Sequence, residues 1–139
     1  ACHSNDGKTA LMEVLDMADA VQVAIAFAQK HPDETLIVVT ADHETGGLAL
    51  GSVSEYVMLF NELGPQSQSK DALFANGKKD EALLVSQMNA MAKIGWTTSA
   101  HTGIPVPVYA TGTGSNLFGG RMDNTEIPKK ICQAMGVAY

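Results

Sequence analysis

Basic residues, cysteines and aromatic residues are all scarce in this chain of 139 residues. Nine Lys and Arg residues stand against fifteen Asp and Glu residues, which gives a net charge of −6 and a pI near 5.0. Proteins that bind nucleic acid or a membrane surface usually need a clustered positive field, so this composition argues against both kinds of partner. An anionic ligand would need positive potential from another source, such as a metal ion or a helix N-terminus.

Long apolar runs are also absent. No run approaches the roughly twenty residues that span a bilayer, and the first seven residues have neither the basic nor the apolar region of a signal peptide. The two cysteines, Cys2 and Cys132, fit neither a zinc-knuckle spacing nor a disulfide framework. They are either free thiols or one long-range bridge, and the redox compartment stays open. The length suffices for a single domain, residues 1–139, to bury a core.

Hydrophobic periodicity predicts helices that alternate with strands. Apolar residues recur at three- and four-residue steps between positions 6 and 30, which predicts an amphipathic helix. The continuous, β-branched run over 36–40 is typical of strands buried on both faces of a parallel sheet. Similar reasoning predicts helices over 80–94 and 127–135, and a short strand over 106–110 that leads into a Gly-rich loop. We therefore expect an α/β fold with mainly parallel strands flanked by helices.

Asp42 and His43 stand side by side where the predicted buried strand ends. Ligands bind at that end of a strand in open α/β sheets, and the pair offers one oxygen and one nitrogen to a zinc-like ion. The competing interpretation is an ordinary turn in which Asp caps a backbone N–H. His3, ahead of the first helix, and His101, in a Thr-Gly turn, can join the pair from distant loops, although a single histidine is more often a surface residue.

Several short segments occur in a specific order along the chain. They are Thr-Ala-Asp-His at 40–43, His-Thr-Gly at 101–103, Val-Pro-Val at 106–108, Leu-Phe-Gly-Gly at 117–120 and Asp-Asn-Thr-Glu-Ile at 123–127. In order and spacing, these segments resemble the C-terminal half of the alkaline phosphatase family. The resemblance runs over most of the chain, and residues 52–95 are its least family-specific part.

The resemblance implies a phosphatase that hydrolyses phosphate monoesters through a phosphoserine intermediate, with two zinc ions and one magnesium ion. By position, Asp42 and His43 would bind one zinc ion, and His3 and His101 would bind the second. The two zinc ions would lie roughly 4 Å apart, one beside the attacking oxygen and the other beside the leaving oxygen. The resemblance also implies an alkaline-phosphatase-like sandwich and a periplasmic or secreted location.

The family's nucleophilic serine, phosphate-binding arginine and magnesium ligands, with further zinc-binding aspartates, have no counterpart in this chain, as the resemblance implies. We therefore expect a C-terminal fragment that holds partial zinc sites and is inactive alone. Strands cut from a sheet expose their edges, so self-association or a homodimer is expected. Two alternatives stay open: another metal-dependent phosphohydrolase or mutase of the same superfamily, and a non-catalytic metal-binding or interaction module.

Overall fold

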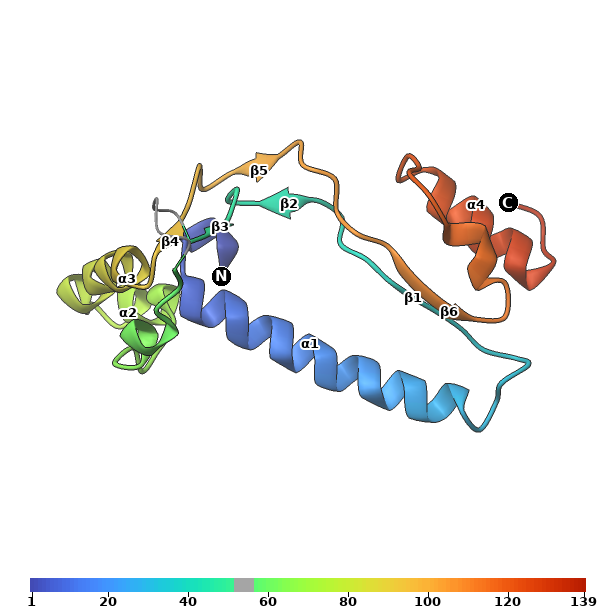
Figure 1. The fold of residues 1–139 in the computed structure, drawn as a ribbon, viewed down its shortest axis with the longest axis horizontal. Helices are drawn as coiled ribbons and strands as arrows, with labels where there is room; N and C mark the ends of the chain where they lie inside the picture. The colour runs from blue at the N-terminus through green and yellow to red at the C-terminus, as the bar shows by residue number, and fades with distance from the viewer. Residues whose placement is uncertain (52–56) are drawn as a thin grey trace. The chain divides into compact units, whose positions relative to one another are not determined.

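The computed structural model describes residues 1–51 and 57–139, which group into two compact units (Figure 1). The first unit comprises Ala1–Met17 and His43–Ile104, and the second comprises Ala18–Asp42 and Pro105–Tyr139. Each unit is built from two separate stretches of sequence. The single domain expected from the sequence stays a prediction. Among the described helices, none is both long and apolar enough to cross a membrane.

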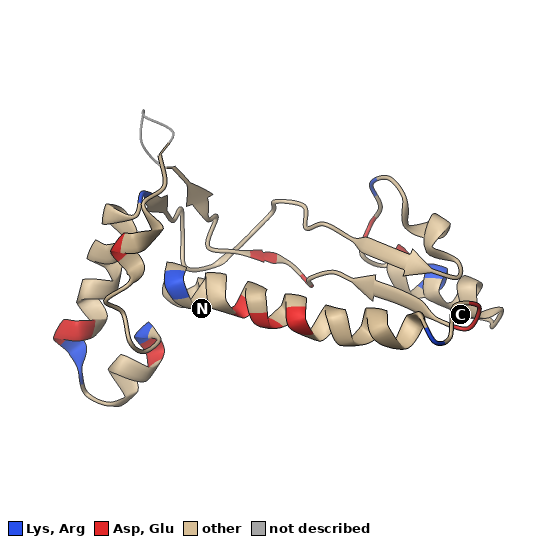
Figure 2. Cartoon of the chain, turned by 60° about the horizontal axis from the view of Figure 1, so that its bottom comes forward, with Lys and Arg blue, Asp and Glu red and all other residues tan. Residues whose placement is uncertain are grey.

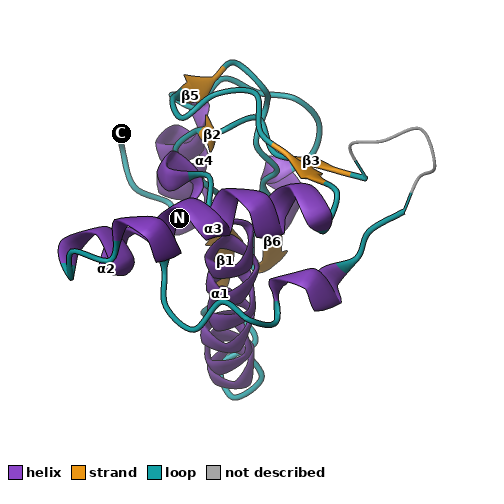
Figure 3. Cartoon of the chain, turned by 90° about the vertical axis from the view of Figure 1, so that its left-hand side faces the viewer, coloured by secondary structure: helices purple, strands orange, loops and turns teal. Residues whose placement is uncertain are grey.

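Helices and short strands alternate along the chain (Figure 1, Figure 3). The helices are α1 (Gly7–Ala28), α2 (Lys70–Ala75), α3 (Lys79–Met91) and α4 (Glu126–Met135), with 3-10 helices η1 (Cys2–Ser4), η2 (Phe60–Leu63) and η3 (Ser115–Phe118). The strands are β1 (Leu36–Val39), β2 (Glu44–Thr45), β3 (Ala49–Leu50), β4 (Ile94–Gly95), β5 (His101–Thr102) and β6 (Tyr109–Gly112). The three helices and the first strand predicted from the sequence are confirmed to within a few residues at their ends.

β6 begins and ends later than the sequence predicts. The expected strand covers 106–110, whereas β6 covers Tyr109–Gly112. Its first residue, Tyr109, pairs with Val39, and its last residue, Gly112, pairs with Leu36. Prolines at 105 and 107 have no N–H to donate, so the pairing starts after them. Gly112 has a φ of 94°, and a Cβ at this position would clash with the carbonyl oxygen of Thr35. The first glycine of the predicted loop therefore belongs to the strand.

The second unit places the β1–β6 ribbon between two helices (Figure 1). Successive side chains of a strand point to opposite faces. Ile37 lines a cavity together with Ile25 of α1, whereas Leu36 and Val38 line another cavity together with Ile131 of α4. Helices therefore cover both faces of β1, which accounts for its continuous apolar sequence.

All strand pairs in the described residues are antiparallel, so the expected mainly parallel arrangement is wrong for this part of the protein. β1 pairs with β6, β2 with β5, and β3 with β4. The apolar run of β1 indicates that both faces are covered, but it contains no information on the direction of the neighbouring strand. The mixture of helices and strands agrees with the expected α/β class.

The core of the first unit consists of two adjacent clusters. One contains Leu63, Ala92 and Ile94, and the other contains Leu73, Ala82 and Val85. Met88 of α3 packs against both clusters. Side chains on two sides of α3 are therefore buried, against η2 and β4 on one side and against α2 on the other.

α1 exposes both acidic and apolar side chains. Figure 2 shows acidic positions along this helix, which the sequence gives as Glu13, Asp16 and Asp19. Val14 and Val23 of the same helix are 66% and 73% exposed. The self-association expected from the sequence stays a prediction.

Asp6 is a buried carboxylate that joins the starts of two helices. Its Oδ1 accepts hydrogen bonds from the backbone N–H of Thr9 at 3.1 Å and from Nε2 of Gln66 at 2.8 Å. Its Oδ2 accepts from the Thr9 hydroxyl at 2.8 Å and from the backbone N–H of Lys70 at 2.7 Å. Thr9 lies in the first turn of α1 and Lys70 begins α2, so one side chain caps both helices.

The turn between His3 and α1 is also fastened to α3. Asn89, which is buried, accepts a hydrogen bond from the backbone N–H of Gly7 at 3.1 Å and donates one to the carbonyl oxygen of Asn5 at 2.6 Å. Ser4 donates to the carboxylate of Asp71 at 2.5 Å. The helices of the least family-specific segment thus hold the backbone on which His3 stands.

Candidate metal centre

The backbone orients the ring of His3, which lies in η1 directly before α1. Nδ1 of His3 is 2.8 Å from the carbonyl oxygen of Ser99. A carbonyl oxygen can only accept, so Nδ1 carries the proton and donates it. In the neutral ring, Nε2 then presents a lone pair, which is the form in which histidine binds a metal ion.

His101 brings a second ring nitrogen to the same point. Its Nε2 lies 3.3 Å from Nε2 of His3, although the two residues are 98 positions apart in the sequence. His101 is held in the β2–β5 ladder, in which it pairs with Thr45 while Thr102 pairs with Glu44. The short antiparallel ladder therefore positions one of the two rings, and the start of α1 positions the other.

His43 stacks on His101, with ring centroids 3.4 Å apart and ring planes inclined by 25°. Nδ1 of His43 lies 3.2 Å from the hydroxyl oxygen of Thr45. The structure thus brings together three of the four residues that the sequence predicts as ligands. His43 therefore meets His101 through its ring face, whereas His3 meets His101 through Nε2.

Asp42, the fourth predicted ligand, is an exposed residue at the end of the second unit's first stretch. Its predicted role beside His43 stays a prediction from the sequence. Within residues 1–51 and 57–139, no three His, Cys, Asp or Glu side chains are grouped so that they could hold one ion together. The donor set that the geometry supports is therefore the pair formed by His3 and His101.

The spacing of this pair fits one tetrahedral zinc ion. Zn–N bonds of about 2.0–2.1 Å at a tetrahedral angle place two ligating nitrogens about 3.3 Å apart. The same 3.3 Å separation also suits a single N–H···N hydrogen bond in which His101 donates to His3. Because ligating histidines must be deprotonated, an ion and this shared proton would compete for one position.

The turn at 45–47 fastens β2 to the segment that carries His101. The N–H of Gly46 donates to the carbonyl oxygen of Ala100 at 3.0 Å, and its carbonyl oxygen accepts from Thr97 at 2.9 Å and Thr98 at 3.1 Å. Gly46 has a φ of 90°, and a Cβ here would lie 2.6 Å from the ring of Trp96. The positive φ and the close approach of the Trp96 ring therefore require glycine at this position.

Cys2 precedes His3 but is not added to the donor set. Cys2 and Cys132 are both free thiols, so no disulfide joins them. Burial raises the pKa of the Cys2 thiol and the charges of Glu13 and Glu44 raise it further, against the N-terminal ammonium group, which lowers it. No described group of three His, Cys, Asp or Glu side chains includes Cys2, so the geometry does not add it to the pair.

Three residues beside the histidines are not singled out by the sequence. Ser99 acts through its backbone carbonyl group, which no side-chain pattern reveals. Glu44 and Thr102 directly follow His43 and His101, and this adjacency is their one signal in the sequence. Their importance is visible only once the ladder register is known.

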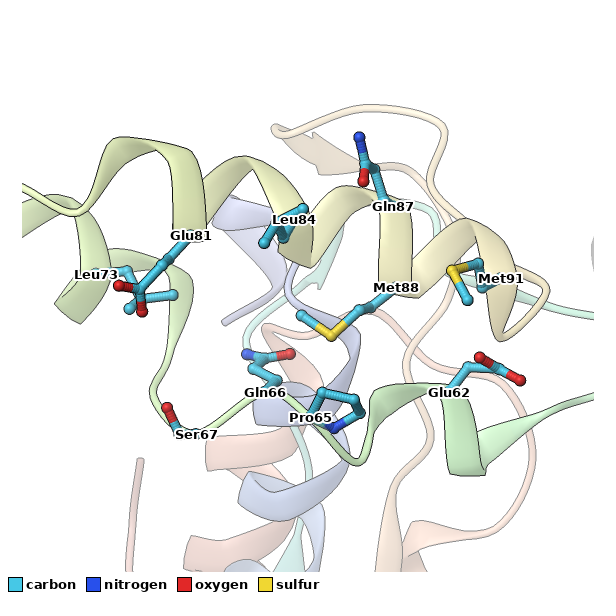
Figure 4. Close-up of a pocket in the computed structure, with 10 residues that line it drawn as sticks. All are labelled: Glu62, Pro65, Gln66, Ser67, Leu73, Glu81, Leu84, Gln87, Met88 and Met91. Carbon is cyan, nitrogen blue, oxygen red and sulfur yellow. The ribbon is translucent and has the colours of Figure 1, made fainter.

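A separate cavity of about 300 Å³ lies beside α3 (Figure 4). Met88 of α3 points toward Gln66 and Pro65 across it, and Leu84 of the same helix also lines it. Its described lining contains carboxylates but no lysine or arginine, and none of the four predicted ligands takes part in it. An apolar cavity with acidic groups does not suit a phosphate group, so the candidate site stays at the histidines.

Helices and strands in alternation, with histidines that converge from distant segments, define an α/β protein with a candidate metal centre. The family model described as alkaline phosphatase matches residues 1–137. The chain therefore belongs to the alkaline phosphatase family.

Two curated relatives are similar over most of this chain. Alkaline phosphatase 3 of Bacillus subtilis (strain 168) is 32% identical over 97% of the chain, and streptomycin-6-phosphate phosphatase of Streptomyces griseus is 31% identical over 97% of it. The chain spans 37% of the first relative and 26% of the second. More than half of each relative thus has no counterpart in these 139 residues.

Two solved structures are similar to the fold. The cold-active alkaline phosphatase from the psychrophile Shewanella sp. matches 100% of this chain and 43% of its own, with a TM-score of 0.82 at 31% identity. A TAB5 alkaline phosphatase variant with Mg bound matches 99% of this chain and 33% of its own, with a TM-score of 0.65 at 28% identity. The fold is therefore an α/β fold of the alkaline phosphatase kind.

Proposed function

We propose that His3 and His101 hold one zinc ion in the active site of a phosphatase. The observation that supports this most strongly is the 3.3 Å separation of their Nε2 atoms, with the His3 ring oriented by the Ser99 carbonyl oxygen. An acidic protein that acts on an anion needs a local source of positive charge. When bound, a zinc ion supplies that charge and polarises a phosphoryl oxygen.

The second zinc position is proposed from the family resemblance alone. In the family, the Thr-Ala-Asp-His motif binds the other zinc ion, so Asp42 and His43 would hold that ion in this chain. Magnesium is proposed for the whole protein because the TAB5 alkaline phosphatase variant was solved with Mg bound. We assign no residue of this chain to magnesium.

For the whole protein we propose hydrolysis of phosphate monoesters through a phosphoserine intermediate. The family match and the phosphatase names of the relatives support this proposal. By the resemblance, the chain lacks further zinc-binding aspartates and the nucleophilic serine. We therefore expect these 139 residues to bind metal weakly and not to turn over substrate by themselves. A periplasmic or secreted location is proposed on the same resemblance.

Titrating the 139-residue chain with zinc tests the proposed pair. We expect the imidazole ¹H–¹⁵N signals of His3 and His101 to shift together, with weak affinity because two nitrogens form only half of a tetrahedral site. His101→Ala should weaken binding by at least about tenfold, equal to about 1.4 kcal/mol. His31→Ala changes a histidine of the second unit and should bind zinc like the wild type. If the His101→Ala variant binds zinc as tightly as the wild-type chain, the proposed pair is refuted.

An activity assay tests the expected lack of turnover. With zinc, magnesium and a chromogenic phosphate monoester at alkaline pH, the 139-residue chain should release product no faster than its His101→Ala variant. The physical reason is that metal ligands without a nucleophile cannot form a covalent intermediate. Release several times faster than in the variant would contradict the expected lack of turnover.

A further inference from the structure

The ladder that positions His101 is very short. β2 and β5 pair over two residues each, Glu44 with Thr102 and Thr45 with His101. An isolated two-stranded ribbon is marginally stable in water even when it is longer than this. The backbone ladder alone is therefore too weak to fix the ring of His101, and additional contacts must hold the two strands in register.

The carboxylate of Glu44 supplies such contacts on both strands. Its Oε1 and Oε2 accept the backbone N–H of Gly47 at 3.0 Å and 3.2 Å, which closes the turn after β2. Its Oε2 also accepts the hydroxyl of Thr102 on the opposite strand. Hydrogen bonds to an ionised carboxylate are stronger than those between neutral groups. One half-buried side chain thus links the turn after β2 to β5.

The two ends of this link are the residues that follow the stacked histidines. Glu44 is bonded covalently to His43, and Thr102 to His101. A shift of β5 along β2 would carry His101 away from both His43, on which it stacks at 3.4 Å, and Nε2 of His3. The carboxylate–hydroxyl contact opposes such a shift, because it ties Glu44 on β2 to Thr102 on β5.

We propose that Glu44, acting through Thr102, is a positioning residue that holds His101 at the distance from His3 that one zinc ion requires. The inference rests on the proposed zinc pair and extends it to two residues that do not touch the ion. Both oxygens of Glu44 are occupied by N–H and O–H donors, which suits an orienting role rather than ligation. Partners of this kind, located behind the ligands, typically contribute 10- to 100-fold to metal affinity.

Replacing the Thr102 hydroxyl tests the link without changing charge. Thr102→Val keeps the β-branched shape, which suits a strand, and loses the hydroxyl, so we expect its zinc affinity to fall about tenfold. Thr102→Ser keeps the hydroxyl and should bind within about threefold of the wild type, on the same principle. Thr113→Val, the same substitution at a residue of the second unit, should leave zinc affinity unchanged.

The imidazole signals of the metal-free chain distinguish positioning from a general loss of stability. Thr102→Val should shift the ring signals of His43 and His101, whose stacking it disturbs, at a temperature where the circular dichroism of the fold is unchanged. If Thr102→Val does not fold, Glu44→Gln replaces it, because a glutamine has the same size and keeps only one accepting oxygen. Glu44→Gln is then expected to lower zinc affinity and to shift the ring signals of His43 and His101 in the same way.

Three results are informative. Reduced affinity in Thr102→Val with recovery in Thr102→Ser supports the positioning role. Wild-type affinity in both Thr102→Val and Glu44→Gln overturns that role while the zinc pair stands. Absence of zinc-induced shifts at His3 and His101 in the wild-type chain overturns the proposed zinc pair itself, and the positioning role with it.

Discussion

Asp6→Ala should lower the free energy of unfolding by about 3–4 kcal/mol, as measured by urea denaturation of the 139-residue chain. The substitution removes a cap from α1 and another from α2, each worth about 1 kcal/mol. It also removes the carboxylate acceptor of the Gln66 Nε2, and a buried donor that loses its acceptor costs about 1–3 kcal/mol. Because Asp6 is only 1% exposed, water does not replace the lost oxygens.

The free energy of unfolding lost in Asp6→Ala should depend on pH. Burial raises the pKa of Asp6, but its hydrogen bonds to Gln66, Lys70 and Thr9 lower it more, so the pKa in the folded chain lies below the ordinary value of 3.8. The stability that the carboxylate contributes is complete above 3.8 and is lost as the pH falls through the folded-state pKa. The gap between wild type and Asp6→Ala should therefore narrow at acid pH.

Asp16→Ala is the matched control for this experiment. Asp16 is an exposed carboxylate of the same helix, so its removal should change the free energy of unfolding by less than about 0.5 kcal/mol. A loss below about 1 kcal/mol in Asp6→Ala would mean that the buried carboxylate does not hold the two helices as described.

Gly46→Ala should cost about 3 kcal/mol and disrupt the stacking of His43 on His101. The φ of 90° strains any residue with a Cβ by about 1–2 kcal/mol, and the new methyl group would lie 2.6 Å from the ring of Trp96. Relief of that contact must move either Trp96 or the turn that bonds to the segment before His101. Thermal unfolding gives the loss of stability, and the imidazole signals of the two histidines give the change in stacking.

Gly77→Ala separates the two causes. Gly77 also has a positive φ, 73°, but nothing lies within 4 Å of the position where its Cβ would be. This variant should therefore show the backbone strain alone, about 1 kcal/mol, with unchanged histidine signals. Equal losses in Gly46→Ala and Gly77→Ala would show that the contact with Trp96 has no energetic consequence.

The sequence predicts what depends on local pattern. The periodicity of α1 and the apolar run of β1 predict these elements, because each pattern indicates which faces of its own element are covered. The direction of the strand beside β1 depends on Tyr109–Gly112, which lie 70 to 76 positions from their partners in β1, and no local pattern encodes it. The expectation of parallel strands was wrong for this reason.

The sequence predicts the histidines of the candidate site, but it does not predict the residues that hold those histidines in place. His3, His43 and His101 are recognisable because few side chains bind zinc, and motif order indicates where each belongs. Asp6, Asn89 and Glu44 look like ordinary polar residues of a surface or a turn. Their roles come from partners 58 to 84 positions away, which only the folded chain identifies.

The pairing of His3 with Ser99 and His101 has a consequence for the order of folding. His3 leaves the ribosome first among the three, yet its partners lie 96 and 98 positions later in the chain. Contacts between such distant positions carry a large loop-closure entropy and form slowly. During synthesis, helical segments such as α1 and α3 can form from local contacts well before the two ring nitrogens meet. We therefore expect the contact between His3 and His101 to form late in folding.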